Sequence, residues 1–438
     1  MLLIDMEKYH KALNKTLLLK IRGKVTQVIG LTIESEGPSG NIGELCYIYP
    51  KDGKEPIHAE VVGFRSGKVL LMPLGEMHGI GPGCEVEGAG QPLAVGVGPA
   101  LLGRVLDGLG HPIDGKGPLL TKQTYSIYNT PPNPITRPRI TEPLATGVRV
   151  IDTLLTFGKG QRIGIFAGSG VGKSTTLSMI ARNTEAELSV IGLIGERGRE
   201  LRDFIERDLG EEGLKRSVVV CATSDQPALV RLKGAFVATA IAEYFRDQGK
   251  NVILMMDSVT RFAMAGREVG LAVGEPPATK GYTPSVFATL PKLLERSGTS
   301  PRGSVTGIYT VLVEGDDMNE PIADTVRSIL DGHVVLSRGI AHQNRYPAVD
   351  VLASISRLFP EVTSQEQQLA AGKMREIMGV YAKNEDLINI GAYQDGSDSR
   401  VDYAKRMIHE VWDFCKQGTY EPSPFEETID RMIDLVGR

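Results

Sequence analysis

Short apolar runs recur between about residue 147 and residue 360, and the segments between them have the character of helices. The runs predict strands at 162–166, 188–194, 217–222, 251–256 and 304–313, with the clearest helix at 227–248. Strands that alternate with helices usually form a mostly parallel sheet with helices on both faces. The pattern therefore predicts an α/β domain in the middle of the chain.

A different pattern precedes this domain. From about residue 19 to residue 90, short β-like runs are separated by glycines, which is typical of a small β-barrel. An oligonucleotide-binding barrel would need basic residues interleaved with aromatic ones, and these are lacking, so a structural collar is favoured. The stretch from Gly88 to about Pro143 is rich in glycine and proline and is expected to be an extended linker that is stiff in its second half.

The two ends of the chain carry helical patterns. Residues 1–18 place Met6, Tyr9, Leu13 and Leu17 on one stripe of a predicted helix, which either packs on its own domain or docks another protein. After about residue 363 the strand signals vanish, and 365–381 and 402–416 are predicted helices. The expected domains are an amphipathic helix (1–18), a β-barrel (19–90), an α/β domain with its entry linker (91–362) and a helical domain (363–438).

A glycine-rich segment, Ala-Gly-Ser-Gly-Val-Gly-Lys-Ser at 167–174, follows the strand predicted at 162–166 and opens into a helix. Strand, glycine loop and helix form the context of a P-loop. Its glycines let backbone N–H groups converge on a polyphosphate, and the helix dipole favours the same anion. The expected nucleotide contacts are Gly168, Ser169, Gly170, Val171, Gly172, Lys173, Ser174 and Thr175.

Two residues of this loop carry specific roles. Lys173 is expected to reach the β- and γ-phosphates, and the Ser174 hydroxyl to ligate Mg²⁺. Ala167 stands where the usual pattern has its first glycine, which is tolerable if its φ is negative. The segment predicts a protein that binds a nucleotide together with Mg²⁺.

Carboxylates follow two of the other predicted strands. Asp257 ends the apolar run 251–256, and ligands of parallel sheets lie at the carboxyl ends of the strands, so Asp257 is expected to help hold Mg²⁺ as a Walker B acid. Glu196 closely follows the run 188–194 and could orient an attacking water, while the positive charge of Arg197 could stabilise the negative charge of the phosphate.

Composition narrows the setting without changing this picture. The 438 residues are 41% apolar and 23% charged, with a net charge of −4, so a large nucleic-acid footprint is not expected. Cys46, Cys84, Cys221 and Cys415 are scattered, which favours a reducing, cytoplasmic setting over disulfides or zinc. Neither a membrane span nor a secretory signal is expected, so any membrane association would come through a partner.

A longer motif supplies a resemblance. Pro347-Ala348-Val349-Asp350, followed by Ser354 and Ser356, fits the signature of the ATPases of the rotary synthase family. Within that family, the blocks 167–174, 195–200, 243–249 and 274–277 are similar to the flagellar and type III secretion export branch. The resemblance runs from about residue 20 to residue 420. It implies a RecA-like P-loop core between an N-terminal β-barrel and a C-terminal helical domain.

The resemblance also implies roles for single residues. Lys173, Glu196 and Arg197 would be catalytic, with Glu196 as the catalytic carboxylate. Arg357 matches the arginine finger that a neighbouring subunit contributes in trans, and its alternative is a local ion pair. Tyr346 matches the aromatic residue that stacks on adenine, and its alternative is a buried turn tyrosine.

The leading hypothesis is a cytoplasmic, homohexameric ATPase that serves flagellar protein export. The resemblance implies a regulatory stalk protein at residues 1–18, a central stalk-like protein at the channel loop 275–283, and an export gate, chaperones and export substrates. An injectisome ATPase is the nearest alternative. A non-catalytic subunit of a rotary machine is disfavoured by Lys173 and Glu196, and a ring-shaped RNA translocase by the near-neutral barrel.

Overall fold

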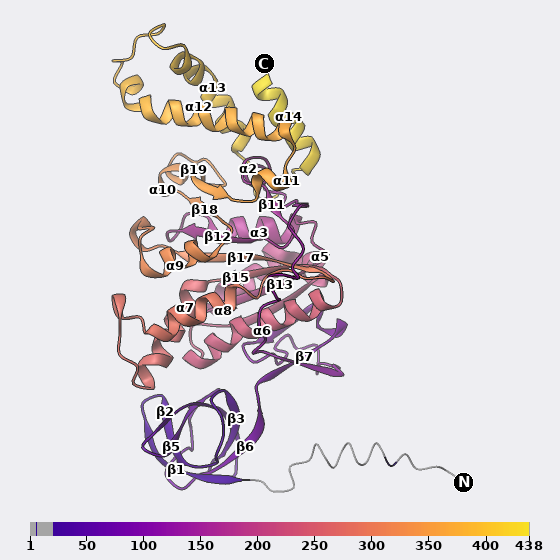
Figure 1. Ribbon diagram of the computed structural model, residues 1–438, viewed down its shortest axis with the longest axis vertical. Coiled ribbons are helices and arrows are strands. Elements are labelled where there is room, and N and C mark those ends of the chain that lie inside the picture. Colours follow the sequence, from indigo (N-terminus) through magenta and orange to yellow (C-terminus); the bar gives the residue numbers. More distant parts are fainter. Residues whose placement is uncertain (1–5, 7–20, 438) are drawn as a thin grey trace, which may run out of the picture. The chain divides into compact units, whose positions relative to one another are not determined.

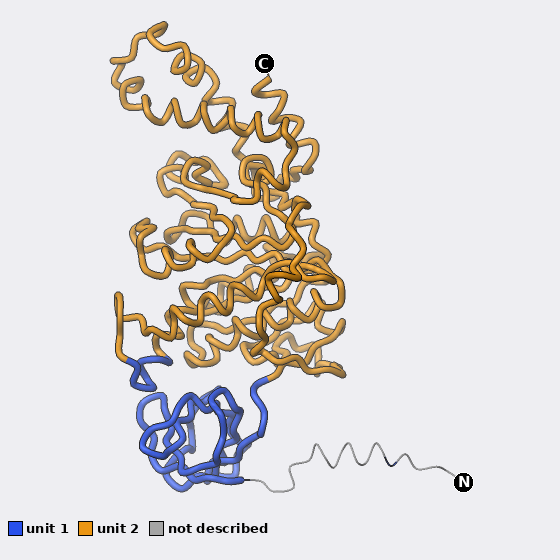
Figure 2. Tube along the Cα trace, in the orientation of Figure 1, with its two compact units in different colours: residues 1–93, 269–275 blue, residues 94–268, 276–438 orange. Residues whose placement is uncertain are grey.

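The computed structural model describes residue 6 and residues 21–437 (Figure 1). The helix expected at 1–18 therefore lies, apart from Met6, outside the described residues. The described residues form two compact units, one within residues 1–93 together with 269–275 and one of residues 94–268 together with those described in 276–438 (Figure 2).

The first unit contains the predicted β-barrel. Its six strands close in the order β1-β2-β5-β4-β3-β6, and every pairing is antiparallel. Alternate side chains point inward, where Ile33, Ile48 and Leu71 are fully buried. The strands are β1 Arg22–Ile29, β2 Thr32–Glu36, β3 Glu44–Tyr49, β4 Ile57–Arg65, β5 Lys68–Pro73 and β6 Glu85–Pro92.

The second unit is built on a nine-stranded sheet with the order β19-β18-β12-β17-β15-β13-β14-β8, to which β16 adds beside β17. The neighbours along this order are parallel except β18 and β19. The strands are β8 Arg104–Asp107, β12 Arg162–Ala167, β13 Leu188–Ile194, β14 Ser217–Ala222, β15 Asn251–Asp257, β16 Gly298–Thr299, β17 Ser304–Leu312, β18 Gly332–Leu336 and β19 Val349–Ser356. All five predicted strands are confirmed within a residue.

Helices cover both faces of this sheet, as the pattern predicts. On one face Ile165 and Ile191 join the cluster that contains Leu177 of α3 (Lys173–Asn183). The other face packs on α6 (Ala228–Asp247), because a Cβ placed on Gly192 would lie 3.2 Å from Cβ of Ala238. Side chains alternate between the two faces of a strand, so the continuous apolar runs are what a sheet buried on both sides requires.

The linker prediction is wrong in part. Residues 88–143 contain β7 (Ala94–Val97), which pairs with β9 (Gln123–Ser126), and they supply β8, the edge strand next to β14. The physical reason is that these strands are only four residues long and are fixed by pairing with distant residues, which local composition does not encode. Strands β18 and β19 were not predicted from the sequence either.

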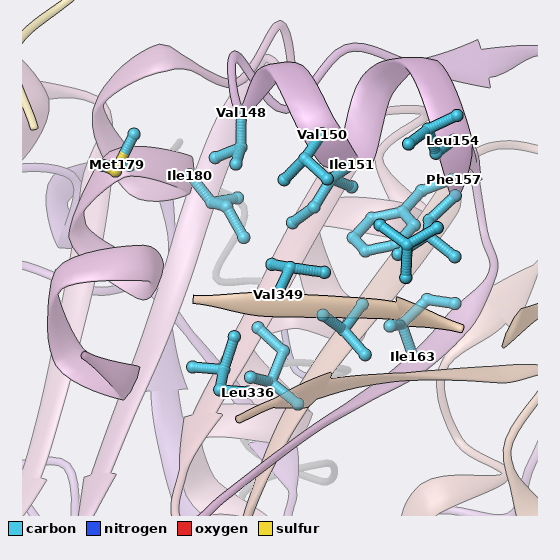
Figure 3. Packing of buried hydrophobic residues seen from close by; sticks show 14 of the residues in the cluster. Val148, Val150, Ile151, Leu154, Phe157, Ile163, Met179, Ile180, Leu336 and Val349 are labelled. Atoms are coloured by element: carbon cyan, nitrogen blue, oxygen red, sulfur yellow. The ribbon is translucent and has the colours of Figure 1, made fainter. Parts of the chain in front are cut away.

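The C-terminal part is helical, as predicted. It consists of α12 Gln365–Asn389, α13 Ser399–Cys415 and α14 Phe425–Gly437. These helices join the core of the second unit, whose largest cluster includes Met374, Met407 and Met432. Figure 3 shows that core around α2 (Arg149–Leu154), where labelled side chains of α2, α3, β12, β18 and β19 converge.

The remaining elements are short strands, single turns and the helices that connect the sheet. They are η1 Pro99–Leu101, β10 Pro143–Leu144, β11 Phe157–Gly158, α4 Gly198–Asp203, η2 Phe204–Leu209, α5 Gly210–Lys215, α7 Val259–Ala272, η3 Thr279–Gly281, α8 Pro284–Leu294, η4 Glu314–Asp316, α9 Pro321–Ile329, α10 Arg338–His342 and α11 Phe359–Val362.

Candidate active site

The glycine-rich segment forms the expected turn. Strand β12 ends at Ala167 and helix α3 begins at Lys173. Between them Gly170 and Gly172 adopt φ of 78° and 99°, a left-handed conformation that favours glycine. Ala167 is the last residue of the strand and is not among the residues with positive φ, so the alanine at this position is accommodated. A Cβ on Gly170 would meet only open space, which leaves the inside of the turn free for a ligand.

Lys173 lies between two carboxylates. It forms an ion pair with Asp257, and its Nζ is 3.7 Å from Oε1 of Glu196. Asp257 also accepts a hydrogen bond of 2.7 Å from the Thr310 hydroxyl. These side chains end neighbouring strands or start the helix after one, and a parallel sheet brings such positions to one edge. The structure thus brings together the residues that the sequence predicts for phosphate binding, metal binding and catalysis.

Glu196 is held in an unusual state for a carboxyl group. Its burial raises its pKa to about 7, with the nearby Asp257 acting in the same direction and the positive Lys173 opposing both. Its Oε1 is buried and accepts no hydrogen bond from the described residues. This oxygen faces the ammonium group of Lys173 at 3.7 Å without accepting a hydrogen bond, so it can accept one from a water molecule or a ligand that enters the site.

A cavity of about 690 Å³ opens beside this group. Its walls come from the P-loop, from the segment after β13 and from the segments that follow β15, β17 and β18; they include Gly168, Ser169, Gly170, Gly172, Lys173, Ser174, Thr175, Glu196, Arg197, Glu200, Arg261, Glu314 and Arg338. Arg197 is 81% exposed and lies 3.7 Å from Glu200. Val171, by contrast, is buried, so it can offer a ligand only its backbone.

Two cations at this cavity were missed by sequence reasoning. Arg261, on the first turn of α7, lies against Gly195 and has a buried Nε with no hydrogen-bond acceptor among the described residues. Arg338 begins α10. Arg261 stands four residues after Asp257, but Asp257 ends a strand and Arg261 belongs to the helix that follows, so this spacing does not predict that the two side chains share a face. No local pattern marks Arg338.

Tyr346 lies near the P-loop. Its ring carbons are 3.8 Å from the place that a Cβ on Gly172 would occupy, and 43% of the residue is exposed. It also lines a second cavity of about 310 Å³ that includes Trp412. Tyr346 is therefore not the buried turn tyrosine of the alternative interpretation. Its ring is available for stacking beside the glycine loop.

Arg357 lies at the amino ends of the parallel strands, whereas the P-loop lies at their carboxyl ends. It follows Ser356, which pairs with Gly332, and Gly332 pairs with Ile163 at the start of β12. The P-loop begins only after Ala167, about 13 Å further along this strand. Arg357 is exposed, and no ion pair or side-chain hydrogen bond joins it to another described residue, so the alternative of a local ion pair is not what the structure contains.

Comparison with known proteins places this geometry in a family. The model of the ATP synthase alpha/beta nucleotide-binding domain matches residues 147–356, that of the family's β-barrel domain residues 25–90, and that of the T3SS EscN ATPase C-terminal domain residues 363–434. A flagellum-specific ATP synthase of Bacillus subtilis (strain 168) is 60% identical over 95% of both chains. The chain belongs to the flagellar and type III secretion branch of the ATP synthase alpha/beta family.

Other relatives and solved structures fall in the same branch. A type 3 secretion system ATPase of Xanthomonas euvesicatoria is 52% identical over 94% of both chains. The structure of the assembled ATPase EscN from enteropathogenic E. coli has a TM-score of 0.90 and 46% identity, covering 94% of this chain and all of that one. EscN in complex with its central stalk EscO gives a TM-score of 0.88 and 45% identity, with the same coverage.

Family membership explains the signature motif in structural terms. Ser354 donates its hydroxyl hydrogen to the carbonyl of Asp350 and accepts a hydrogen bond from the backbone of Val335. Ser356 is buried and joins Gln161 to the carbonyl of Thr156. The signature of the ATP synthase alpha/beta family therefore fixes the antiparallel edge strand β19, between Tyr346 and Arg357, onto the P-loop sheet.

Two absences concern the described residues. No group of three or more His, Cys, Asp or Glu side chains between residues 21 and 437 is arranged to hold a metal ion on its own. None of the helices in the same part of the chain has both the length and the apolar character that crossing a membrane requires.

Proposed function

We propose that this protein hydrolyses Mg-ATP to support the export of flagellar proteins. The observation that carries the proposal is the convergence of Lys173, Asp257 and Glu196 at the end of a P-loop. The flagellar role is supported by the flagellum-specific ATP synthases of Bacillus subtilis and Treponema pallidum (strain Nichols), which are 60% and 54% identical.

The first step is exchange of charge partners at Lys173. Its ammonium group pairs with Asp257 in the structure. A triphosphate in the loop offers Lys173 a stronger anion, while backbone N–H groups of residues 168–175 bind the same phosphates. Asp257 and the Ser174 hydroxyl are hard oxygen donors beside the loop, a set that fits Mg²⁺. When bound, Mg²⁺ would neutralise charge on the phosphate oxygens.

Glu196 is the proposed catalytic carboxylate. Its buried Oε1 faces Lys173 but accepts no hydrogen bond from the described residues, and it would accept one from the attacking water and so orient that water toward the γ-phosphate. Arg197, the next residue, lines the same cavity, and its positive charge would stabilise the negative charge that develops on the phosphate. Tyr346 would stack on adenine beside Gly172.

Arg357 would complete the site of a neighbouring subunit. It lies at the amino ends of the strands, about 13 Å along β12 from its own P-loop. Only a second copy of the chain could therefore place this arginine next to the phosphates. We infer a homohexameric ring, and the assembled form of the relative EscN supports this inference.

The remaining partners follow from the relatives. The EscN–EscO complex supports a central stalk-like protein, which would meet the loop 275–283 in the channel. A regulatory stalk protein at residues 1–18, and an export gate, chaperones and export substrates, complete the proposal. The protein would be cytoplasmic and would reach the inner face of the membrane only through these partners.

Replacement of Lys173 tests the proposal. Lys173→Ala should abolish ATP hydrolysis and weaken Mg-ATP binding, because it removes the cation aimed at the phosphates. Lys405→Ala, which breaks an exposed ion pair with Asp395 far along the chain, is the matched control and should keep full activity. Hydrolysis by Lys173→Ala at a rate near that of the wild type would refute the assignment.

An injectisome ATPase is the second candidate, favoured by the 52% identity to the type 3 secretion system ATPase of Xanthomonas euvesicatoria. The chemistry would be the same. Capture of partners from an extract of the native cells with the full-length protein separates the two: flagellar components support the first candidate, and injectisome components support the second.

A further inference from the structure

Arg338 emerges at the same edge of the sheet as the P-loop. Strand β18 runs parallel to β12 and pairs its last residue, Leu336, with Ala167. Ser337 then caps helix α10 by accepting a hydrogen bond from the backbone of Ile340, so Arg338 is the first residue of that helix. The side chain of Arg338 therefore leaves the backbone beside the glycine loop. In the strand order, β18 lies on one side of β12, and β13, the strand that Glu196 follows, lies on the other.

Arg338 forms an ion pair that rests on the P-loop backbone. Its Nε lies 3.4 Å from Oδ2 of Asp316. A Cβ on Gly168 would lie 2.5 Å from Oδ1 of Asp316 and 2.9 Å from Nη2 of Arg338, so both charged groups lie directly over this glycine. A side chain at this position would require the flexible ends of Asp316 and Arg338 to shift.

The two partners differ in how they relate to the cavity. Arg338 contributes to the wall of the 690 Å³ cavity that also holds Lys173 and Glu196, whereas Asp316 does not. Arg338 is therefore the partner of this pair that a phosphate in the cavity could reach. Both side chains are about half exposed, and a pair of that kind contributes little stability and exchanges readily for a better partner.

Asp316 also belongs to a segment with an unusual backbone. Gly315 and Asp316 have φ of 63° and 58°, in the left-handed region that glycine adopts readily and that aspartate adopts more often than most other residues. The segment follows β17, and the backbone of Val313 donates a hydrogen bond of 3.0 Å to the carbonyl of Ala167. The segment that leads into Gly315 and Asp316 is thus joined to the end of β12 at Val313.

We propose that Arg338 binds the terminal phosphate of ATP and exchanges Asp316 for it, so that Arg338 and Asp316 together select ATP over ADP. A guanidinium group donates two parallel hydrogen bonds to a phosphate, which makes it a stronger partner for a terminal phosphate than for a half-exposed carboxylate. The pair with Asp316 holds Arg338 over Gly168. The inference rests on the proposed ATPase function and adds a ligand-selecting residue to it.

The test is equilibrium binding of two nucleotides to the full chain. Isothermal titration with Mg²⁺ present should compare a non-hydrolysable ATP analogue with ADP. Arg338→Gln should weaken binding of the ATP analogue by about tenfold or more, which is the scale of a lost hydrogen bond to a charged group. The affinity for ADP should change by less than about threefold. Asp316→Asn frees Arg338 and should leave triphosphate binding unchanged or tighter.

Controls separate this inference from the function on which it rests. Arg327→Gln breaks an exposed arginine–aspartate pair on α9 and should change neither affinity. Arg338→Lys keeps the charge but not the planar fork and should fall between wild type and Arg338→Gln. The inference would be overturned if Arg338→Gln left the ratio of the affinities for the ATP analogue and ADP unchanged. It would also be overturned if Asp316→Asn weakened binding of the ATP analogue as much as Arg338→Gln does. Failure of the wild type to bind either nucleotide would instead overturn the proposed function.

Discussion

At the scale of single residues, the site depends on one carboxyl group whose surroundings differ from those of its neighbours. Glu196→Gln should still bind Mg-ATP, because the amide has nearly the same shape, but it cannot polarise water as a carboxylate does. Turnover should fall by roughly two to four orders of magnitude. Steady-state hydrolysis together with nucleotide titration checks this. Unimpaired turnover would exclude Glu196 and direct attention to Glu200.

The raised pKa of Glu196 gives a second prediction. The carboxylate form is the one that accepts a proton, and a pKa of about 7 means that this form is lost as the pH falls through 7. The value of kcat/KM should therefore decrease between pH 8 and pH 6. The same profile for Glu196→Gln should lack this decrease. A wild-type profile that is flat over this range would contradict the assignment.

Much of the site could be predicted because its residues lie in short local patterns. Lys173, Glu196 and Asp257 each follow an apolar strand, and parallel strands bring such positions to one edge. Arg261 and Arg338 could not be found this way. Arg338 follows β18, a strand without a clear sequence signal, and its partner Asp316 lies on a different segment that only the folded sheet brings near it.

At the scale of elements, a buried ion pair holds α6 to segments far from it in the chain. Arg296 and Glu243 are each 1% exposed, with Nη2 and Oε2 2.6 Å apart. Arg296 also donates to the carbonyl of Ile127, and Asn129 donates to Glu243. Glu243 opens one of the blocks that carry the family resemblance, so the role of that block is structural at this position.

Removing one partner of this pair should be costly. Glu243→Gln leaves a buried guanidinium group without its counter-charge, and the free energy of unfolding should fall by about 3 kcal/mol. Asp324→Asn removes a partner from an exposed pair with Arg327 and should change it by less than about 1 kcal/mol. Calorimetric unfolding of both variants checks the difference. Equal effects would show that the buried pair is not what holds α6.

The elements show which parts of the fold the sequence encodes locally. Strands such as 188–194 are buried on both faces, so their unbroken apolar runs identify them. Residues 104–107 have no such run, yet they pair with β14 and extend the sheet, because long-range pairing outweighs weak local preference. Helix α12 continues to Asn389, beyond the predicted end at residue 381.

At the scale of the whole molecule, the positions of the P-loop and Arg357 at opposite edges of one sheet favour an active site shared between subunits. Such a site is complete only after assembly. The specific activity should therefore increase with protein concentration, and Mg-ATP, by binding across the interface, should favour the assembled form. Hydrolysis and sedimentation measured over the same concentrations check this. A specific activity independent of concentration, in a preparation that remains monomeric, would contradict it.

The most direct test of a shared active site is the turnover of Arg357→Ala in assembled rings. This variant should bind Mg-ATP as the wild type does, because its own P-loop is untouched. Its turnover should fall on the order of 10³-fold or more, the scale of an arginine finger. Arg327→Gln, at a half-buried arginine on α9 that pairs with Asp324, is the matched control and should retain full turnover. Turnover of Arg357→Ala within about tenfold of the wild type, in rings of normal size, would contradict the account.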